Sequence, residues 1–192
     1  MCILTSHNVP GMAGVDQAAF REAISHFASG VTVITTVHDG RRVGMTASAV
    51  SSLSLDPILL LVCINTKLTT HTAIEQSRRF VVNVLGEGQE ELALHFARSA
   101  DDKFAGIATR ADYDLPVLDD AIAHFVCDVH ERFPGGDHSI FIGQVLACEA
   151  QPGRRPLVYF RSGFGELRDK QAELQRELAV WDAVAYGEIP PD

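Results

Sequence analysis

The sequence predicts one mainly β domain with a few inserted helices, an α+β fold built around an antiparallel barrel. Six or seven short apolar runs have the patterns of strands, and turns join most of them. No G-x-G-x-x-G motif follows any of these runs, which disfavours a parallel dinucleotide-binding sheet. With 192 residues, 46% of them hydrophobic, the chain is long enough for one sizeable core. A closed or partly open barrel is therefore favoured over a βαβ sheet.

The first predicted element is an amphipathic helix that Asp16 can cap and Gly30 can end. Its apolar residues recur at helical spacing: Phe20, Ala23, Ile24 and Phe27. The alternating run over residues 31–38 and the turn "DGRR" after it then predict a β-hairpin that spans residues 31–50.

The middle of the chain alternates buried strands with short helices. The apolar runs 58–64 and 79–85 predict two buried strands. The segments "TTHTAIEQS" (69–77) and "QEELALHFA" (89–97) predict a helix after each strand. From residue 101 to residue 120 the sequence is polar and irregular, which predicts a long loop of the kind that often carries function.

The last strands form a second hairpin. Residues 121–133 and 138–150 alternate again, and "PGGD" between them predicts a wide turn. A short strand is predicted over residues 156–160.

The pattern changes from Glu166 onward to an amphipathic helix of about five turns. Its apolar residues have a three-four spacing: Leu167, Leu174, Leu178, Trp181 and Ala185. The chain therefore divides into a leader (1–14), a barrel domain (15–167) and a C-terminal helix with its tail (168–192).

The charge of the chain limits its partners. The net charge is −9, with 16 Lys and Arg against 25 Asp and Glu, which disfavours binding to nucleic acid or to an anionic membrane surface. A phosphate-bearing ligand would need a few local cations and backbone amides. No run approaches the ~18 apolar residues of a membrane span, and the N-terminal segment lacks the pattern of a signal peptide. We expect a cytoplasmic protein.

The cysteines do not form a recognisable framework, because no C-x-x-C pair occurs. The four are Cys2, Cys63, Cys127 and Cys148. The last three lie in apolar runs, so they are interpreted as buried thiols in a reducing compartment.

A metal site at "HFVCDVH" (124–130) is not expected, although the residue types suit one. Strand alternation places His124, Asp128 and His130 on one face and Cys127 on the other. The histidines are therefore predicted to belong to a polar outer face. Nucleophilic hydrolysis has no support either, because no G-x-S-x-G motif is present.

The most unusual stretch is "GMTASAVSSLSLDP" (44–57), which is rich in small hydroxyl residues and leads directly into the most apolar strand. Such a surface can grip a flat heteroaromatic ring. The next segment, "NTKLTTH" (65–71), starts a predicted helix, whose free amides favour an anion beside Lys67. An edge strand with a solvated face and an ordinary capped helix would show the same pattern. Both interpretations remain open from the residues alone.

Two further features are candidates for a site. His138 follows a glycine-flexible turn and opens a strand, so its imidazole can project from a rim into a cleft. Lys103 and Phe104 lie in the irregular segment, where they can supply a phosphate contact and a ring stack. A turn histidine and ordinary surface residues are the alternatives.

The order of the motifs resembles one family. "ASGVTVITT", "GMTASAVSSLSLDPILLLVCINTKLTTH", "FVVNVL", "KF", "PGGDHSIFIGQV" and "PLVYFRSGFGEL" resemble the flavin reductase family, the small reductase components of two-component flavin-dependent monooxygenases in the FMN-binding split-barrel superfamily. The resemblance covers residues 20–167. It implies a split β-barrel with Greek-key topology that works as a homodimer, with flavin near the dimer interface.

The resemblance also implies an activity and its residues. A hydride passes from NADH or NADPH to FAD or FMN, and the reduced flavin leaves for a separate monooxygenase. The isoalloxazine is expected along Met45, Thr46, Ala47, Ser48 and Ala49. The ribityl chain and phosphate are expected near Ser51, Ser52, Asn65, Lys67 and Thr70. Lys103 and Phe104 match a second flavin contact, and the nicotinamide pocket matches His138, Tyr159 and Phe164.

His138 is expected to orient the nicotinamide, since hydride transfer between two stacked rings needs no protein nucleophile or metal. Two alternatives stay open: a flavin oxidase like pyridoxamine-phosphate oxidase, and a non-catalytic flavin- or haem-binding module. The choice of flavin, of nicotinamide and of partner oxygenase also stays open, as does whether the C-terminal helix packs in cis or across the dimer.

Overall fold

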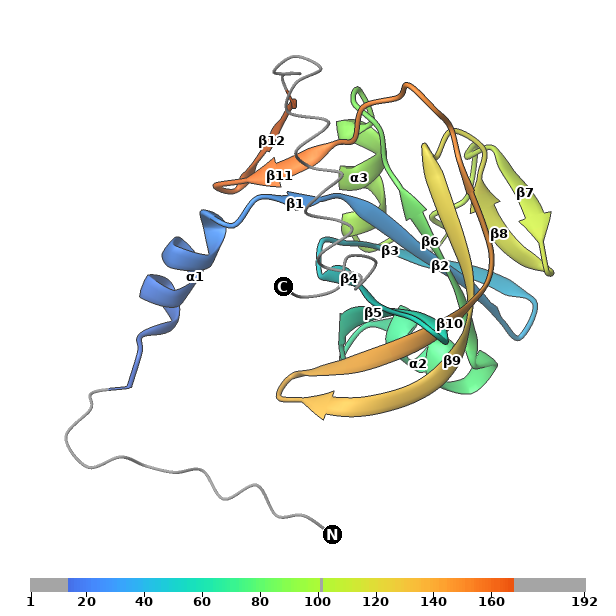
Figure 1. The fold of residues 1–192 in the computed structure, drawn as a ribbon, viewed down its shortest axis with the longest axis horizontal. Coiled ribbons are helices and arrows are strands. Elements are labelled where there is room, and N and C mark those ends of the chain that lie inside the picture. Colours follow the sequence, from blue (N-terminus) through green and yellow to red (C-terminus); the bar gives the residue numbers. More distant parts are fainter. Residues whose placement is uncertain (1–13, 101, 168–192) are drawn as a thin grey trace, which may run out of the picture.

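A seven-stranded antiparallel sheet curls on itself to form the body of the protein in the computed structural model, which describes residues 14–100 and 102–167 (Figure 1). Its strands are β2 (Thr32–His38), β3 (Arg41–Ala47), β4 (Val50–Leu55), β5 (Ile58–Asn65), β6 (Arg79–Val84), β9 (Ala123–Gly135) and β10 (His138–Ala150). Their order is β3-β2-β6-β9-β10-β5-β4. The mainly β fold predicted from the sequence is confirmed.

The two edges of this sheet are consecutive in the chain. β3 ends at Ala47 and β4 begins at Val50, so that only Ser48 and Ala49 separate opposite edges of a seven-stranded sheet. The sheet must therefore curl until its edges meet at these two residues, which we call the seam. The predicted hairpin of residues 31–50 is thus too long, because β3 stops before its last three residues.

Strand alternation and two helices create the core. The inner face of the barrel buries large apolar residues from β2, β5, β6, β9 and β10, including Ile34, Val62, Phe80 and Phe141. Cys127 belongs to this cluster, as the sequence predicts. α2 (Thr69–Ser77) packs against β2 and β3, and α3 (Glu90–Ala97) packs against β3 and β2. Both helices lie where the sequence predicts them.

The polar segment from residue 101 to 120 is more ordered than predicted. It contains a hairpin of β7 (Thr109–Asp112) and β8 (Leu115–Leu118). Leu115 and Val117 pack on Val81 and Val126 on the outside of the main sheet. The prediction of a long loop was wrong here, because "LPVL" is too short to show a period. Its burial depends on a surface supplied by other strands.

A second, three-stranded sheet lies beside the barrel (Figure 1). It consists of β1 (Ser29–Gly30), β11 (Val158–Phe160) and β12 (Gly163–Gly165). β11 corresponds to the last predicted strand. No helix in the described ranges 14–100 and 102–167 is long and apolar enough to cross a membrane.

The first helix, α1 (Gln17–Ser25), stands apart from the barrel (Figure 1). It ends at Ser25 and not at Gly30, and the side chain of Asp16 makes no capping hydrogen bond. None of its residues is buried, and Phe20, Ile24 and Phe27 are all more than half exposed. Its predicted apolar face is therefore present but uncovered in the single chain. The predicted C-terminal helix and nearly all of the leader lie outside the described residues.

Candidate functional site

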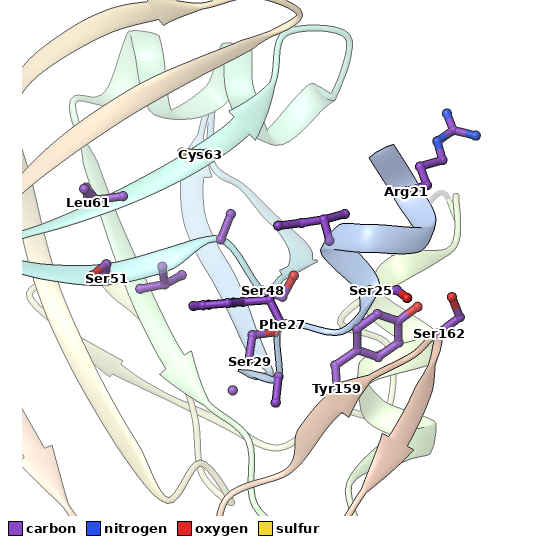
Figure 2. Close-up of a pocket in the computed structure, with 15 residues that line it drawn as sticks. Arg21, Ser25, Phe27, Ser29, Ser48, Ser51, Leu61, Cys63, Tyr159 and Ser162 are labelled. Carbon is purple, nitrogen blue, oxygen red and sulfur yellow. The ribbon is translucent and has the colours of Figure 1, made fainter. Parts of the chain in front are cut away.

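A large hollow of about 710 Å³ opens at the seam (Figure 2). Ser48, Ala49 and Ser51 line one side of it, and Leu61 and Cys63 of β5 continue this wall. The opposite side comes from α1, β11 and the residues just after each of them: Arg21, Ile24, Ser25, Phe27, Tyr159 and Ser162. The lining is mostly apolar, with small side chains at the seam, so the hollow can admit a flat ring.

A small apolar hollow of about 230 Å³ adjoins the large one, because Ser48 and Tyr159 line both. Thr46, Ala47 and Phe164 complete this wall, with Ala93 and two neighbours from α3. The rings of Tyr159 and Phe164 meet edge to face with their centroids 5.7 Å apart. The structure therefore brings the residues predicted for the isoalloxazine next to two of those predicted for the nicotinamide.

A third hollow of about 260 Å³, which we call the cationic hollow, continues along β3. Arg41, Arg42 and Lys103 line it together with Met45 and with Thr70 at the start of α2. None of its described lining residues is acidic. Met45, Thr70 and Lys103 were predicted as flavin contacts from distant parts of the sequence, and they meet here.

Two backbone carbonyls hold the ammonium of Lys103 in this hollow. Its Nζ donates hydrogen bonds to the carbonyl of Gly44 at 3.1 Å and to the carbonyl of Phe96 at 2.8 Å. Burial lowers the pKa of Lys103 because it removes water from the ammonium. Neither partner carries a negative charge, so the ammonium still favours an anion nearby.

Phe104 does not offer a free ring face. Its side chain is 1% exposed and belongs to the core cluster around α3. One contact is with Phe96, at a centroid distance of 5.2 Å, and another is with the guanidinium of Arg42, at 4.9 Å. This geometry argues against a ring stack between Phe104 and a ligand. The residue instead supports Arg42.

The remaining predicted contacts lie around the start of α2. Asn65 Oδ1 accepts a hydrogen bond from the backbone N–H of Lys67 at 3.0 Å, which shapes the turn before the helix. Asn65 also faces His138 in the ladder between β5 and β10. Ser51 lines the large hollow, whereas Ser52, Asn65 and Lys67 do not line the large, the small apolar or the cationic hollow.

His138 lies at the tip of the β9–β10 hairpin, far from β11 and β12 in the single chain (Figure 1). Its Nδ1 is 2.8 Å from Asp137 Oδ1. The hydrogen bond and the charge of His138 lower the pKa of Asp137. The structure does not place His138 in the hollow that Tyr159 and Phe164 line. Within one chain, the predicted nicotinamide pocket is therefore assembled only in part.

Several residues of the hollows were missed from the sequence. Arg41 and Arg42 were interpreted only as part of the turn "DGRR", and Arg21 was not singled out. Cys63 lines the large hollow, and burial raises its pKa. Two adjacent arginines in an acidic chain were the available signal for the cationic hollow.

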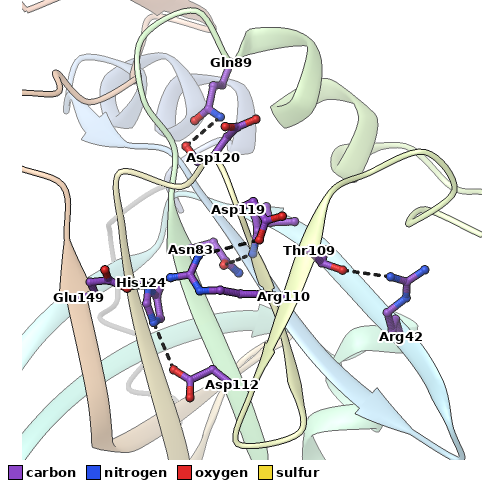
Figure 3. Close-up of polar contacts among 11 residues, drawn as sticks. Arg42, Asn83, Gln89, Thr109, Arg110, Asp112, Asp119, Asp120, His124 and Glu149 are labelled. Atoms are coloured by element: carbon purple, nitrogen blue, oxygen red, sulfur yellow. Dashed lines mark hydrogen bonds and ion pairs between the residues drawn. The ribbon is translucent and has the colours of Figure 1, made fainter.

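The predicted outer face of β9 is partly buried, which corrects the interpretation of His124 (Figure 3). Its side chain is 6% exposed beneath the β7–β8 hairpin. Arg110 Nη2 donates to His124 Nδ1 at 3.3 Å and to Glu149 Oε2 at 2.9 Å. His124 Nε2 faces Asp112 Oδ2 at 3.4 Å. This network fastens the hairpin to the sheet.

The described cysteines differ in their burial. Cys148 is exposed, which corrects its expected burial, whereas Cys127 is buried and its pKa is raised to about 12, mainly by burial. Among residues 14–100 and 102–167, no three His, Cys, Asp or Glu side chains are placed to hold a metal ion.

Comparison with known proteins identifies the family. Residues 24–168 match the family described as "Flavin reductase like domain". This chain belongs to the flavin reductase family. It is therefore an oxidoreductase that acts on flavin with a reduced nicotinamide nucleotide as the hydride donor. The split-barrel fold implied by the motifs is confirmed.

Individual relatives match across most of their length. The reductase component of 4-nitrophenol 4-monooxygenase/4-nitrocatechol 2-monooxygenase from Rhodococcus opacus is 46% identical over 171 residues, which are 89% of this chain and 92% of that one. The reductase subunit HsaB of a flavin-dependent monooxygenase from Mycobacterium tuberculosis is 37% identical over 155 residues, which are 79% of this chain and 83% of that one. The solved NADH:FAD oxidoreductase SgcE6 of Streptomyces globisporus, in complex with NAD and FAD fragments, is 32% identical with a TM-score of 0.78, covering 81% of this chain and 94% of that one.

Proposed function

We propose that this flavin reductase is the reductase component of a two-component flavin-dependent monooxygenase. It takes a hydride from NADH or NADPH, reduces FAD or FMN, and releases the reduced flavin to a separate oxygenase. The observation that carries this proposal is that residues 41–51 line three hollows in succession, cationic at residues 41–45 and mostly apolar from residue 46 onward. A flavin nucleotide has the same two parts, a flat ring and a phosphate arm.

The residues present fit such a ligand. Ser48 and Ala49 leave room for a ring at the seam, because larger side chains there would fill the large hollow. The Thr46 hydroxyl donates to the carbonyl of Ala93, so its methyl group and backbone are the parts left for a ring. Lys103 and Thr70 suit the phosphate end. The alternatives of an oxidase and of a binding module have no such support from the family match.

The chain's own residues position the reactants. A bound flavin supplies the N5 atom that accepts the hydride. Backbone amides near residues 45–52 stabilise the negative charge that develops on the reduced ring. Tyr159 and Phe164 form an aromatic wall on which a nicotinamide can lie, and His138 orients that ring.

We also propose that the chain works as a homodimer. The exposed apolar side chains of α1 would be covered by a second copy, and the same region borders the large hollow. A dimer also supplies a second β9–β10 hairpin, which accounts for a His138 that lies apart from Tyr159 within one chain. The three described cysteines are free thiols, which supports a place in the cytoplasm.

Stopped-flow spectroscopy tests the activity. Purified chain is mixed anaerobically with excess FMN or FAD and with NADH or NADPH, and the bleaching of the flavin is followed. A reductase bleaches many equivalents of free flavin, and the four combinations identify the flavin and the nicotinamide. Retention of one tightly bound flavin without turnover would indicate an oxidase, and binding without bleaching would indicate a non-catalytic module.

His138→Ala tests the assignment of the histidine. We expect a higher KM for the nicotinamide nucleotide and a rate of flavin reduction roughly 10-fold lower, since ring positioning is lost. The KM for flavin should change little. An unchanged KM for the nicotinamide together with an unchanged rate would refute this role.

A further inference from the structure

The cationic hollow is positively charged, whereas the chain as a whole is negatively charged. Three cations, Arg41, Arg42 and Lys103, line about 260 Å³ in a chain whose net charge is −9. Gathering like charges around a concave surface is unfavourable unless an anion binds there. The described lining includes no carboxylate that could neutralise them.

Arg42 is held in place without being neutralised. Its Nη1 donates to the hydroxyl of Thr109 at 3.1 Å (Figure 3). Its guanidinium lies over the Phe104 ring at 4.9 Å. Both partners are uncharged. Other arginines of this protein do pair with carboxylates: Arg79 with Asp128, Arg110 with Glu149, Arg132 with Glu75, and Arg155 with Glu87. Arg42 is thus preorganised while its charge remains available to an anion.

Thr70 provides a second and independent indication. Its side chain is 3% exposed, yet it lines the cationic hollow, and its hydroxyl makes no hydrogen bond to another described residue. No fully buried side-chain oxygen or nitrogen among the described residues lacks a partner. The hydroxyl therefore opens into the hollow, where it can donate to an anion beside the first amides of α2.

The position of the hollow indicates which anion binds. Residues 41–45 of edge strand β3 line the cationic hollow, and residues 46–48 line the small apolar hollow that leads to the seam. From Met45 to Ser48 the strand advances about 10 Å. An extended five-carbon ribityl chain spans a comparable distance. A flavin ring at the seam can thus reach this hollow with its 5′-phosphate.

We propose that Arg42, with Arg41, binds the 5′-phosphate of the flavin and so makes this reductase select FMN and FAD over riboflavin. This inference rests on the proposed function, because it assumes that flavin binds at the seam. It assigns a specificity role to two residues outside the motifs that resemble the family. Phe104 and Thr109 then act as positioning residues that hold the Arg42 guanidinium.

The experiment compares Arg42→Gln and the Arg41→Gln/Arg42→Gln pair with Arg154→Gln, which removes the same charge outside the three hollows. Dissociation constants for riboflavin, FMN and FAD are measured by fluorescence, and KM values are measured with saturating NADH. We expect Arg42→Gln to weaken FMN and FAD binding roughly 10-fold or more and riboflavin binding less than about twofold. Arg154→Gln should leave all three constants unchanged.

Two further variants separate positioning from folding. Arg42→Lys keeps the charge and should restore part of the preference for FMN over riboflavin. Thr109→Val removes only the hydroxyl that orients Arg42, and it should lower the same preference by a smaller factor. Circular dichroism melts identify any variant that loses its fold, and the preference is compared only among folded variants.

Three results would overturn the inference. In Arg42→Gln these are an equal loss of affinity for riboflavin and FMN, no change in either affinity, or a rise in the KM for NADH while both flavin constants hold. The last result would assign the hollow to a dinucleotide phosphate. A wild-type protein that reduces no flavin would instead refute the proposed function, whereas the fluorescence comparison would still report on the phosphate site.

Discussion

The large hollow and the cationic hollow lie at two ends of one edge strand, yet they are built in different ways. Side chains from α1, β5, β11 and the seam line the large hollow, and they are mostly small or apolar. Neighbouring residues of β3, the start of α2 and Lys103 line the cationic hollow. The first can select a ligand by shape and the second by charge. The difference indicates that ring and phosphate are recognised separately, so each can be disrupted alone.

The largest effect is expected from filling the large hollow. Ala49→Trp places a bulky ring at the seam, which should lower kcat/KM for every flavin roughly 100-fold or more. Steady-state bleaching of FMN and riboflavin measures this loss. Ala150→Trp, at the exposed end of β10, is the matched control and should retain activity. Equal activity of the two variants would show that the ring does not bind at the seam.

Gly44→Ala should disturb the cationic hollow more than the large one. A Cβ at this position would lie 2.9 Å from Cε1 of Phe96, whose carbonyl also binds Lys103. We expect a loss of about 1–3 kcal/mol in the free energy of unfolding from this overpacking. Thermal melts measure it, with Gly165→Ala as the control because a Cβ there meets no atom within 4 Å. Identical melting temperatures would contradict the close packing of β3 on α3.

Salt should affect ligand binding in the cationic hollow more than in the large hollow. Raising the salt concentration from about 0.05 M to about 0.5 M shortens the range of electrostatic attraction severalfold. We expect FMN binding to weaken by roughly 3-fold to 10-fold, whereas riboflavin binding should hold or strengthen slightly. Fluorescence titrations at each concentration measure both ligands. Equal losses of affinity for FMN and riboflavin would contradict the idea that the phosphate is recognised by charge and the ring by shape.

A smaller effect is expected in cysteine alkylation, which reports on the large hollow alone. At pH 8, iodoacetamide should modify exposed Cys148 and leave Cys127 intact, since burial raises the pKa of Cys127 to about 12. Cys63 should react slowly, because burial raises its pKa too, and added flavin should protect it. Mass spectrometry of the peptides gives the extent at each site. Protection of Cys148 with no protection of Cys63 would place the flavin elsewhere.

The smallest effect concerns a pair outside both hollows. The hydrogen bond from His138 lowers the pKa of Asp137, so the folded state favours the carboxylate. This contribution to stability is present above the ordinary pKa of an aspartate and is lost as the pH falls through the lowered value. His138→Ala should raise the pKa of Asp137 toward its ordinary value, which an NMR titration detects. An unchanged titration of Asp137 would contradict the contact.

Most elements of the barrel were predictable, because strand alternation is a local property that survives folding. The strands around Val33, Val62 and Phe80 and both short helices follow their patterns. The β7–β8 hairpin was not predictable, since Leu115 and Val117 are buried by Val81 and Val126 from distant strands. The same reason accounts for His124, whose polar face becomes buried only when that hairpin covers it.

The candidate site was predictable in its parts and not in its assembly. Residue type suggested a small-residue surface at Ser48 and Ala49, and the family resemblance assigned Thr70 and Lys103 as flavin contacts. The role of Phe104 could not be predicted from the sequence. Its ring packs against the guanidinium of Arg42, which lies 62 residues earlier in the chain, and against the ring of Phe96. Local patterns cannot specify such a pair.

The amino-acid sequence by itself determined the strand content, the hydroxyl-rich run at residues 44–57 and the family to which the chain belongs. Only the tertiary structure showed that this run is two strands at opposite edges of one sheet, which meet at Ser48 and Ala49. Strand periodicity sets which face a side chain takes, whereas long-range pairing sets which edges meet. The hollows at the seam, and the arginines that give one of them its charge, follow from that pairing.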